Sequence, residues 1–194
     1  MSVLLLAGSP SERSRSAALL DAVSLRLGVR SANVERLHIR NLSPQALLLA
    51  DTAHRSIARA VDQVARARVI VVSTPVYKAA YSGVLKVFLD LLPQFALKDK
   101  LVLPLATGGS PNHMLALDYA LRPVLQSLGA RQILGGVYAT DSQVTLTPEG
   151  AHQLHADIAA RLDDAVATIF SEGLKLPATT GFEPIAFSRV RCSV

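Results

Sequence analysis

The chain has 194 residues, enough for one α/β domain with a sizeable core, and half of its residues are hydrophobic while 18% are charged. This composition excludes disorder over most of the length, and no apolar run approaches the roughly 20 residues that a membrane span needs. The formal net charge of +5 is spread along predicted helices, which argues against nucleic-acid binding and favours small anionic ligands.

The two ends of the chain indicate a cytoplasmic protein without a metal site. Residues 3–7 are apolar, but no basic residue precedes them and a Gly-Ser-Pro turn follows at once, so they predict a strand and not a signal peptide. Cys192 is the only cysteine, which leaves it without a partner for an intrachain disulfide or a neighbouring set of metal ligands.

Strands and helices alternate along the first part of the chain. Residues 3–7 predict a first strand, and residues 17–27 have apolar positions at helical spacing. Residues 33–39 predict a half-exposed strand, a loop containing Pro44 follows, and residues 56–67 predict a second helix.

The alternation continues to the last helix. Residues 69–73 and 101–106 are nearly all apolar, as expected for central strands that are buried on both faces, and residues 82–92 predict the helix between them. The remaining predicted elements are a helix at 112–128, a strand at 132–138 and a helix at 149–171.

This order predicts a flavodoxin-like doubly wound parallel sheet of five strands, in the order 2-1-3-4-5, with helices on both faces. We expect a single domain over residues 1–172. Residues 173–194 contain Pro and Gly without a clear period, and they are expected to form a mobile arm or an oligomer contact.

Ligands of such folds bind beyond the carboxyl ends of the strands, which directs attention to the loops at 8–16, 74–83 and 107–113. The first loop offers phosphate-binding groups at the start of a helix: backbone amides, the hydroxyls of Ser14 and Ser16, and the guanidinium of Arg15. A serine-rich helix cap with solvated arginines is the alternative interpretation.

The other two loops are suited to a flat ligand. The loop at 74–83 combines a proline-fixed backbone with Tyr77 and small residues, which could border a planar ring, although Tyr77 could also simply pack on the domain. Gly108 and Gly109 would let backbone N–H groups approach a ligand without obstruction, although a tight turn would also use glycines.

The three loops carry no acidic residue except Glu12, and no Ser-His-acid or Cys-His set can be assembled at the strand ends. The loops therefore lack the catalytic groups for hydrolysis and the carboxylates that would accept a phosphoryl group. Hydride transfer to a flavin needs no protein nucleophile, because the cofactor carries the chemistry and the protein orients two rings.

The three loops, together with the segments 118–125 and 141–143, resemble the NADPH-dependent FMN reductases, and the resemblance extends to about residue 144. It is greatest to the members that serve bacterial alkanesulfonate monooxygenases. The resemblance implies three groups of FMN contacts: the phosphate at Ser9, Ser14, Arg15 and Ser16, the isoalloxazine border at Pro75, Val76 and Tyr77, and the polar edge of the ring at Thr107, Gly108 and Gly109.

The resemblance also implies that NADPH, or NADH, reduces FMN to FMNH2, which leaves for an FMNH2-dependent monooxygenase in sulfur acquisition. A homo-oligomer, dimer or tetramer, is implied as well, with a π-bulge at its interface around Tyr119. From the residues alone, Tyr119 could equally be a buried aromatic, and Pro123 could account for a kink.

Two alternatives to this function remain open at this stage. One is a quinone or azo-dye reductase that keeps FMN tightly bound. The other is a non-enzymatic electron carrier of the flavodoxin type, although such carriers usually have an acidic face and this chain is basic. The sequence does not decide between NADPH and NADH, because it shows no dedicated pocket for the 2′-phosphate.

Overall fold

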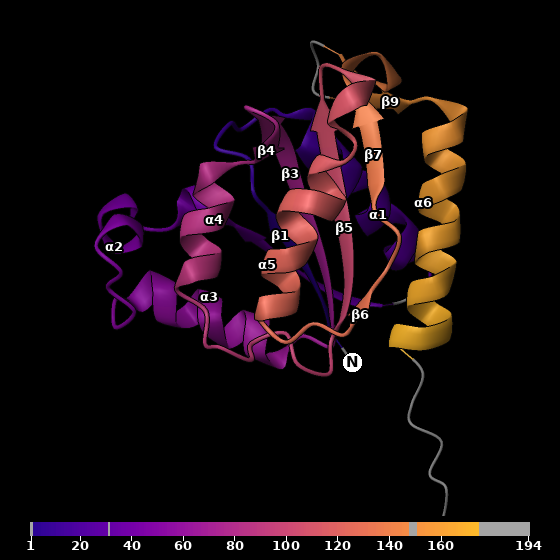
Figure 1. Ribbon diagram of the computed structural model, residues 1–194. Coiled ribbons are helices and arrows are strands. Elements are labelled where there is room, and N and C mark those ends of the chain that lie inside the picture. Colours follow the sequence, from indigo (N-terminus) through magenta and orange to yellow (C-terminus); the bar gives the residue numbers. More distant parts are fainter. Residues whose placement is uncertain (1, 31, 148–150, 175–194) are drawn as a thin grey trace, which may run out of the picture.

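The computed structural model describes residues 2–30, 32–147 and 151–174. Within them a parallel sheet has the order β2-β1-β3-β5-β6, with β7 continuing beside β5 and the short β4 pairing antiparallel with β3 (Figure 1). The elements are β1 (Ser2–Ala7), α1 (Arg15–Val29), β2 (Asn33–His38), α2 (Pro44–Leu48), α3 (Arg55–Arg66), β3 (Val69–Tyr77), β4 (Ala80–Tyr81), α4 (Gly83–Asp90), β5 (Leu101–Gly108), α5 (Arg122–Ser127), β6 (Gln132–Ile133), β7 (Val137–Thr140), β8 (Val144–Leu146), β9 (His152–Leu154) and α6 (Ala156–Thr168).

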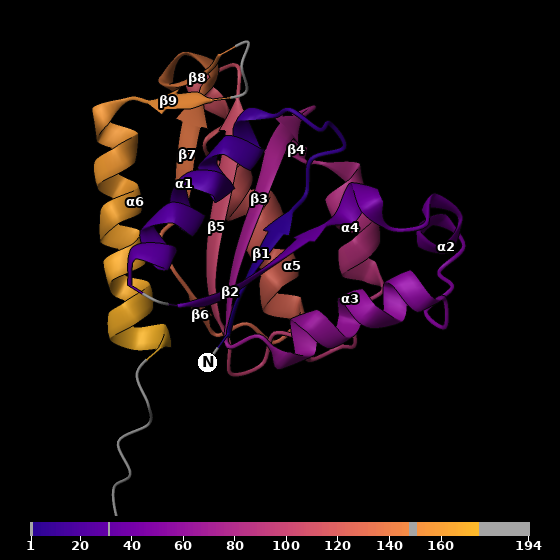
Figure 2. The same cartoon turned by 180° about the vertical axis from the view of Figure 1, so that it is seen from behind.

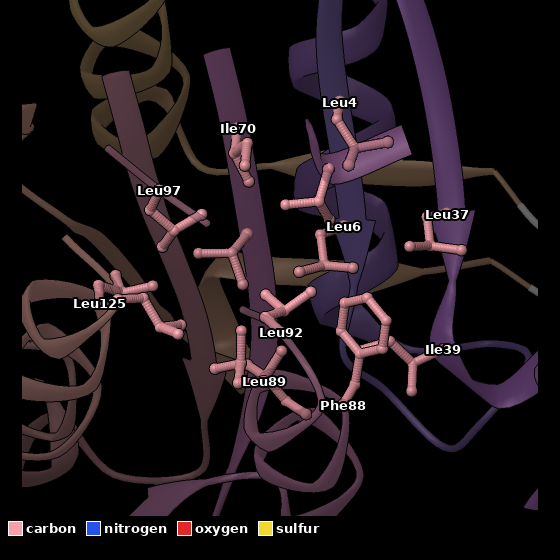
Figure 3. Close-up of a cluster of buried hydrophobic side chains, with 14 of the residues drawn as sticks. Leu4, Leu6, Leu37, Ile39, Ile70, Phe88, Leu89, Leu92, Leu97 and Leu125 are labelled. Carbon is pink, nitrogen blue, oxygen red and sulfur yellow. The ribbon is translucent and has the colours of Figure 1, made fainter. Parts of the chain in front are cut away.

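The sheet is the middle of three layers. Helices α3, α4 and α5 cover one face, and α1 and α6 cover the other, as the two views show (Figures 1 and 2). Alternate residues of β1 point to opposite faces, so Leu4 and Leu6 pack with Phe88 of α4 (Figure 3), while Leu5 packs with the α1 and α6 side. Burial on both faces explains why the central strands are continuous apolar runs.

The predicted doubly wound fold is confirmed, and the predicted strands lie in the expected order. The described sheet has seven strands where five were predicted, because β4 is added and the predicted strand at 132–138 is divided into β6 and β7. The division falls opposite Pro104 of β5, between the residues of β5 that pair with β6 and those that pair with β7. Proline has no N–H to offer a ladder, so the partner strand is interrupted there.

The prediction of a continuous helix at 112–128 is wrong. The structure has a 3₁₀ turn at Pro111–His113, a π-helical turn at Leu117–Leu121, and only then α5. In an α-helix the carbonyl of Tyr119 would accept from the N–H of residue 123, but that residue is Pro123. The missing donor explains why the backbone widens at this point, and the predicted π-bulge around Tyr119 is confirmed.

The helix predicted at 149–171 begins later, with α6 at Ala156. Its first two predicted positions lie outside the described residues, and the next ones form β9, which pairs antiparallel with β8. Val144 of this hairpin is buried against the α1 and α6 side of the sheet, so a tertiary contact favours strand over helix here. The helical backbone ends in a second π-helical turn at Ile169–Gly173.

Two predicted loops begin later than expected. Strand β3 extends to Tyr77 and β5 to Gly108, because the neighbouring strands continue to pair with them. Of the predicted tail, residues 175–194, including Cys192, lie outside the described residues. No described helix combines the length and the apolar character that crossing a membrane requires.

Candidate functional site

The three predicted loops meet at the edge of the sheet where the parallel strands end, near β4 in Figure 1. Ala7, Ser73 and Leu105 are neighbours in the sheet register, so the segments that follow them start side by side. The N–H of Gly8 donates to the carbonyl of Ser73 at 2.8 Å. These pairings hold the first loop against the end of β3.

The serines of the first loop have local roles in the described structure. The Oγ of Ser14 caps α1 by accepting from the N–H of Ala17 at 3.1 Å, and it lies 3.2 Å from the Oγ of Ser16. Ser9 and Ser16 are buried, and the carbonyl of Ser16 accepts from Ser73 Oγ at 2.8 Å. The helix-cap interpretation is thus confirmed for Ser14, and phosphate binding remains a prediction.

Arg15 is held in place by the chain that follows β7. Its Nε donates to the carbonyl of Val144 at 3.1 Å, and its Nη1 lies 3.5 Å from Oδ2 of Asp141. The side chains of Arg15 and Asp141 are 41% and 48% exposed, so the guanidinium keeps a solvent-facing side. Glu12 is the only acidic residue of the three predicted loops, and Asp141 reaches Arg15 from the segment after β7, outside those loops.

Pro75, Val76 and Tyr77 lie at the end of β3 and not in a loop. Tyr77 is 48% exposed, so its ring is available to a ligand. The two residues that follow, Lys78 and Ala79, have φ angles of 51° and 63° and turn the chain into β4. Two left-handed residues in succession are the geometry of a tight type I′ hairpin, which glycine and asparagine adopt more readily than lysine and alanine do.

Hydrogen bonds fix this hairpin to the first loop. The N–H of Ser82 donates to Oγ1 of Thr74 at 2.9 Å, and the Ser82 hydroxyl donates to the carbonyl of Gly8. Thr74 and Ser82 are both buried, and their polar atoms are satisfied by these contacts. Neither residue was singled out from the sequence, although hydroxyl residues between a buried strand and a helix are a usable signal.

The third segment is enclosed on one side by Tyr138. A Cβ added at Gly108 would lie 2.5 Å from the Tyr138 hydroxyl, which donates to the carbonyl of Ser110 at 2.6 Å. Burial, and to a smaller extent Asp141, raises the pKa of Tyr138, so the phenol stays protonated and keeps donating. Gly109 is exposed, and a Cβ there would meet nothing closer than Asp141 Oδ2 at 3.8 Å. Of these two glycines, Gly109 is the one whose backbone is exposed to solvent.

Tyr119 projects from the π-helical turn and is 79% exposed, which is contrary to the alternative of a buried aromatic. Met114 and Leu115, just before the turn, are each 52% exposed, and β4 contacts the turn. A solvent-facing apolar surface therefore lies next to the hairpin that carries Tyr77.

The site combines donors for an anion with an open edge for a flat ring. Arg15 lies in the first turn of α1, where helical N–H groups also favour anions, and the half-exposed ring of Tyr77 follows β3. In the parts of the chain that the structure describes, no group of three or more His, Cys, Asp or Glu residues could hold a metal ion. The donor set fits a phosphorylated planar molecule such as FMN. The fold and this site define a doubly wound α/β protein with a solvent-facing edge at the carboxyl ends of β1 and β3.

Residues 1–145 match the family model of the NADPH-dependent FMN reductases, and the chain belongs to this family of oxidoreductases. An Escherichia coli protein named FMN reductase (NADPH) is 45% identical over 170 residues, which are 88% of this chain and 88% of that protein. A Pseudomonas putida protein named NADH-dependent FMN reductase SfnE is 37% identical over 153 residues, 74% of this chain and 79% of that protein.

Solved structures support the same assignment. The apo form of an NADH:FMN oxidoreductase, EMOB, is 40% identical and superposes with a TM-score of 0.81, covering 92% of both chains. A Streptococcus pneumoniae flavodoxin, only 14% identical, has a TM-score of 0.61 over 88% of this chain and 97% of its own, which shows the shared fold. The flavodoxin-like architecture predicted from the sequence is thus confirmed.

Proposed function

We propose that this enzyme reduces FMN with NADPH, or with NADH, and releases FMNH2 to a separate FMNH2-dependent monooxygenase that takes sulfur from alkanesulfonates. Membership of the FMN reductase family supports the reduction, and the sequence resemblance supports the delivery to a monooxygenase. The observation that carries the proposal is the state of Arg15, which is fixed by Val144 and Asp141 but still open to solvent on one side.

The proposed FMN contacts follow the order of the strands. The phosphate is assigned to the start of α1, the isoalloxazine to the end of β3, and the polar edge of the ring to the end of β5. Bound FMN supplies the acceptor for a hydride from the nicotinamide, and a proton from solvent completes FMNH2. The residues assigned are Ser9, Ser14, Arg15, Ser16, Pro75, Val76, Tyr77, Thr107, Gly108 and Gly109.

The protein's own part is to bind and orient. Arg15 presents charge to the phosphate while its Nε bond to Val144 keeps the guanidinium from turning away. The short β3–β4 hairpin, in which Tyr77 pairs with Ala80, fixes the backbone that carries the Tyr77 ring. The reaction is proposed to need no covalent protein intermediate, because hydride transfer between two bound cofactors needs no protein nucleophile.

The exposed surface around Tyr119 supports a homo-oligomer, a dimer or tetramer, because an apolar side chain that is 79% exposed is covered at lower free energy by another copy. The need for reduced nicotinamide nucleotide supports a cytoplasmic location. Sedimentation of the native chain beside Tyr119→Ala tests the assembly; an unchanged oligomer would remove Tyr119 from its interface.

The primary test follows NADPH oxidation by the purified protein as free FMN is added, with riboflavin as the analogue that lacks the phosphate. Saturating turnover with FMN, and weaker binding of riboflavin, support the proposal. FMN that stays bound through purification, with ping-pong kinetics toward a quinone or azo dye, would favour the quinone or azo reductase. FMN binding without turnover would favour the electron carrier.

Arg15→Ala tests the phosphate assignment separately from turnover. A charged hydrogen bond contributes about 1.5–3 kcal/mol, so FMN should bind about ten to a hundred times more weakly while riboflavin changes little. Fluorescence quenching of the two flavins measures both constants. Equal weakening of both flavins would assign Arg15 to the support of β8 and not to the phosphate.

A further inference from the structure

A cavity of about 450 Å³ lies outside this site, between the edge strand β2 and helix α3, two elements that are labelled in Figure 2. This volume is within the range of small-molecule sites, roughly 300–1,000 Å³. Leu37, Leu42 and Ala60 give it an apolar floor, and each of them is buried. The polar side chains that line it are Arg36, His38, Asn41, His54, Arg55, Ser56, Arg59 and Gln63.

The cavity is positively charged. No carboxylate lines it. Arg36 donates to Oδ1 of Asp21 at 2.5 Å, so its charge is largely balanced. The guanidinium groups of Arg55 and Arg59, by contrast, have no hydrogen bond or ion pair within residues 2–30, 32–147 and 151–174. Two uncompensated cations therefore face a pocket with an apolar floor.

The pKa of His38 is affected by the same positive charge. Burial lowers the pKa of His38 below 6.5, and Arg36 and Arg40 lower it further, against a small opposing effect of Asp21. The imidazole is therefore neutral near pH 7, with one nitrogen able to donate and the other to accept. An anion in this cavity would meet neutral donors as well as charged ones.

The lining chemistry indicates a phosphomonoester attached to a less polar group. The planar fork of a guanidinium matches the oxygens of a phosphate, and two of them can share one phosphate group. The buried floor suits the sugar and base of a nucleotide. No Phe, Tyr or Trp side chain lines the cavity, so it lacks the large stacking rings expected of a site for a nucleic-acid strand.

The cavity is also within reach of the proposed flavin site. His38 pairs with Ala7 in the sheet register, one residue before the first loop, and Arg40 Nη2 lies 3.5 Å from Oε1 of Glu12 within that loop. Strand β2 is two places from β3 in the sheet, a separation of about 10 Å at ordinary strand spacing. One extended dinucleotide can span both places.

We propose that the cavity between β2 and α3 binds the 2′-phosphate of NADPH, and that Arg55 and Arg59 make the enzyme prefer NADPH to NADH. The two nucleotides differ only in that phosphomonoester on the adenosine ribose, which is the chemistry that the cavity selects. The inference rests on the proposed function, since it assigns a place to that reaction's electron donor.

The kinetic test uses the double variant Arg55→Gln/Arg59→Gln, because glutamine keeps helix propensity in α3 while it removes both charges. At saturating FMN, the KM for NADPH should rise about tenfold, while kcat and the KM for NADH stay unchanged. Arg131→Gln removes one exposed charge outside the cavity and should change neither constant. An unchanged KM for NADPH, or an equal rise for both nucleotides, would overturn the assignment.

A binding test separates this inference from the proposed function. Calorimetric titration of the native chain with 2′-AMP should give a constant that the double variant loses, whether or not the protein reduces FMN. 5′-AMP and inorganic phosphate should bind more weakly than 2′-AMP; equal binding of inorganic phosphate would overturn the nucleotide assignment. If 2′-AMP binds as expected but FMN is never reduced, the proposed function fails and the cavity assignment to a 2′-phosphate stands.

Discussion

The contact between Asp141 and Arg15 predicts that the enzyme holds FMN more weakly than it could. Asp141 Oδ2 lies 3.5 Å from Arg15 Nη1, so a phosphate bonded to the same guanidinium would place its charge about 6 Å from the carboxylate. Both side chains are more than a third exposed, so their electrostatic interaction is calculated with the dielectric constant of water and not with that of a protein interior. Asp141→Asn should therefore tighten the binding of FMN.

The magnitude follows from Coulomb's law. Two unit charges about 6 Å apart in water interact by about 0.7 kcal/mol, and a phosphate dianion doubles this repulsion. Salt at about 0.15 M roughly halves this doubled repulsion, which leaves about 0.7 kcal/mol, or about a threefold change in Kd. Because screening weakens at lower ionic strength, the effect should grow when salt is removed.

The assay is fluorescence titration of native protein and Asp141→Asn with FMN and with riboflavin at two salt concentrations. Riboflavin, which has no phosphate, should bind both proteins equally. Asp163→Asn is the matched control, because Asp163 also pairs with an arginine, Arg26, but on helix α6. Weaker FMN binding by Asp141→Asn, or the same gain for riboflavin, would refute the electrostatic reasoning and leave Asp141 as a positioning residue for Arg15.

Three further predictions concern stability, each measured as a shift of the urea midpoint. Gly108→Ala should destabilise the fold by about 1–3 kcal/mol because its Cβ meets the Tyr138 hydroxyl, whereas Gly109→Ala should be tolerated; equal costs would contradict the stated clash. Ala79→Gly should stabilise by about 0.5–1 kcal/mol because it relieves a left-handed residue, while Ala80→Gly should destabilise; shifts of the same sign would show no strain in the turn. The lowered pKa of His38 favours its neutral form in the folded state, so stability should fall as pH drops from 6.5 through that lowered pKa, and His38→Gln, measured in a buffer without phosphate, should remove this slope.

The sequence by itself determined the architecture. Residues 69–73 and 101–106 are nearly all apolar, which is the pattern of a strand covered on both faces, so the central parallel sheet could be predicted directly. The predicted place of the ligand followed, because the carboxyl ends of parallel strands meet at one edge. Pro123, four residues after Tyr119, has no N–H for the Tyr119 carbonyl, which explains the π-helical turn. The prediction of the bulge itself came from the family resemblance.

Tertiary structure alone decided the partners of the candidate groups. Arg15 and Asp141 are far apart in sequence, and their contact depends on how the segment after β7 passes over the start of α1. The hairpin of β8 and β9 replaced the first part of a predicted helix because burial of Val144 outweighs local helical spacing. The cationic cavity has the same origin: β2 and α3 bring together arginines that look like scattered surface charge in the sequence, since periodicity records which face a residue occupies but not what packs beside it.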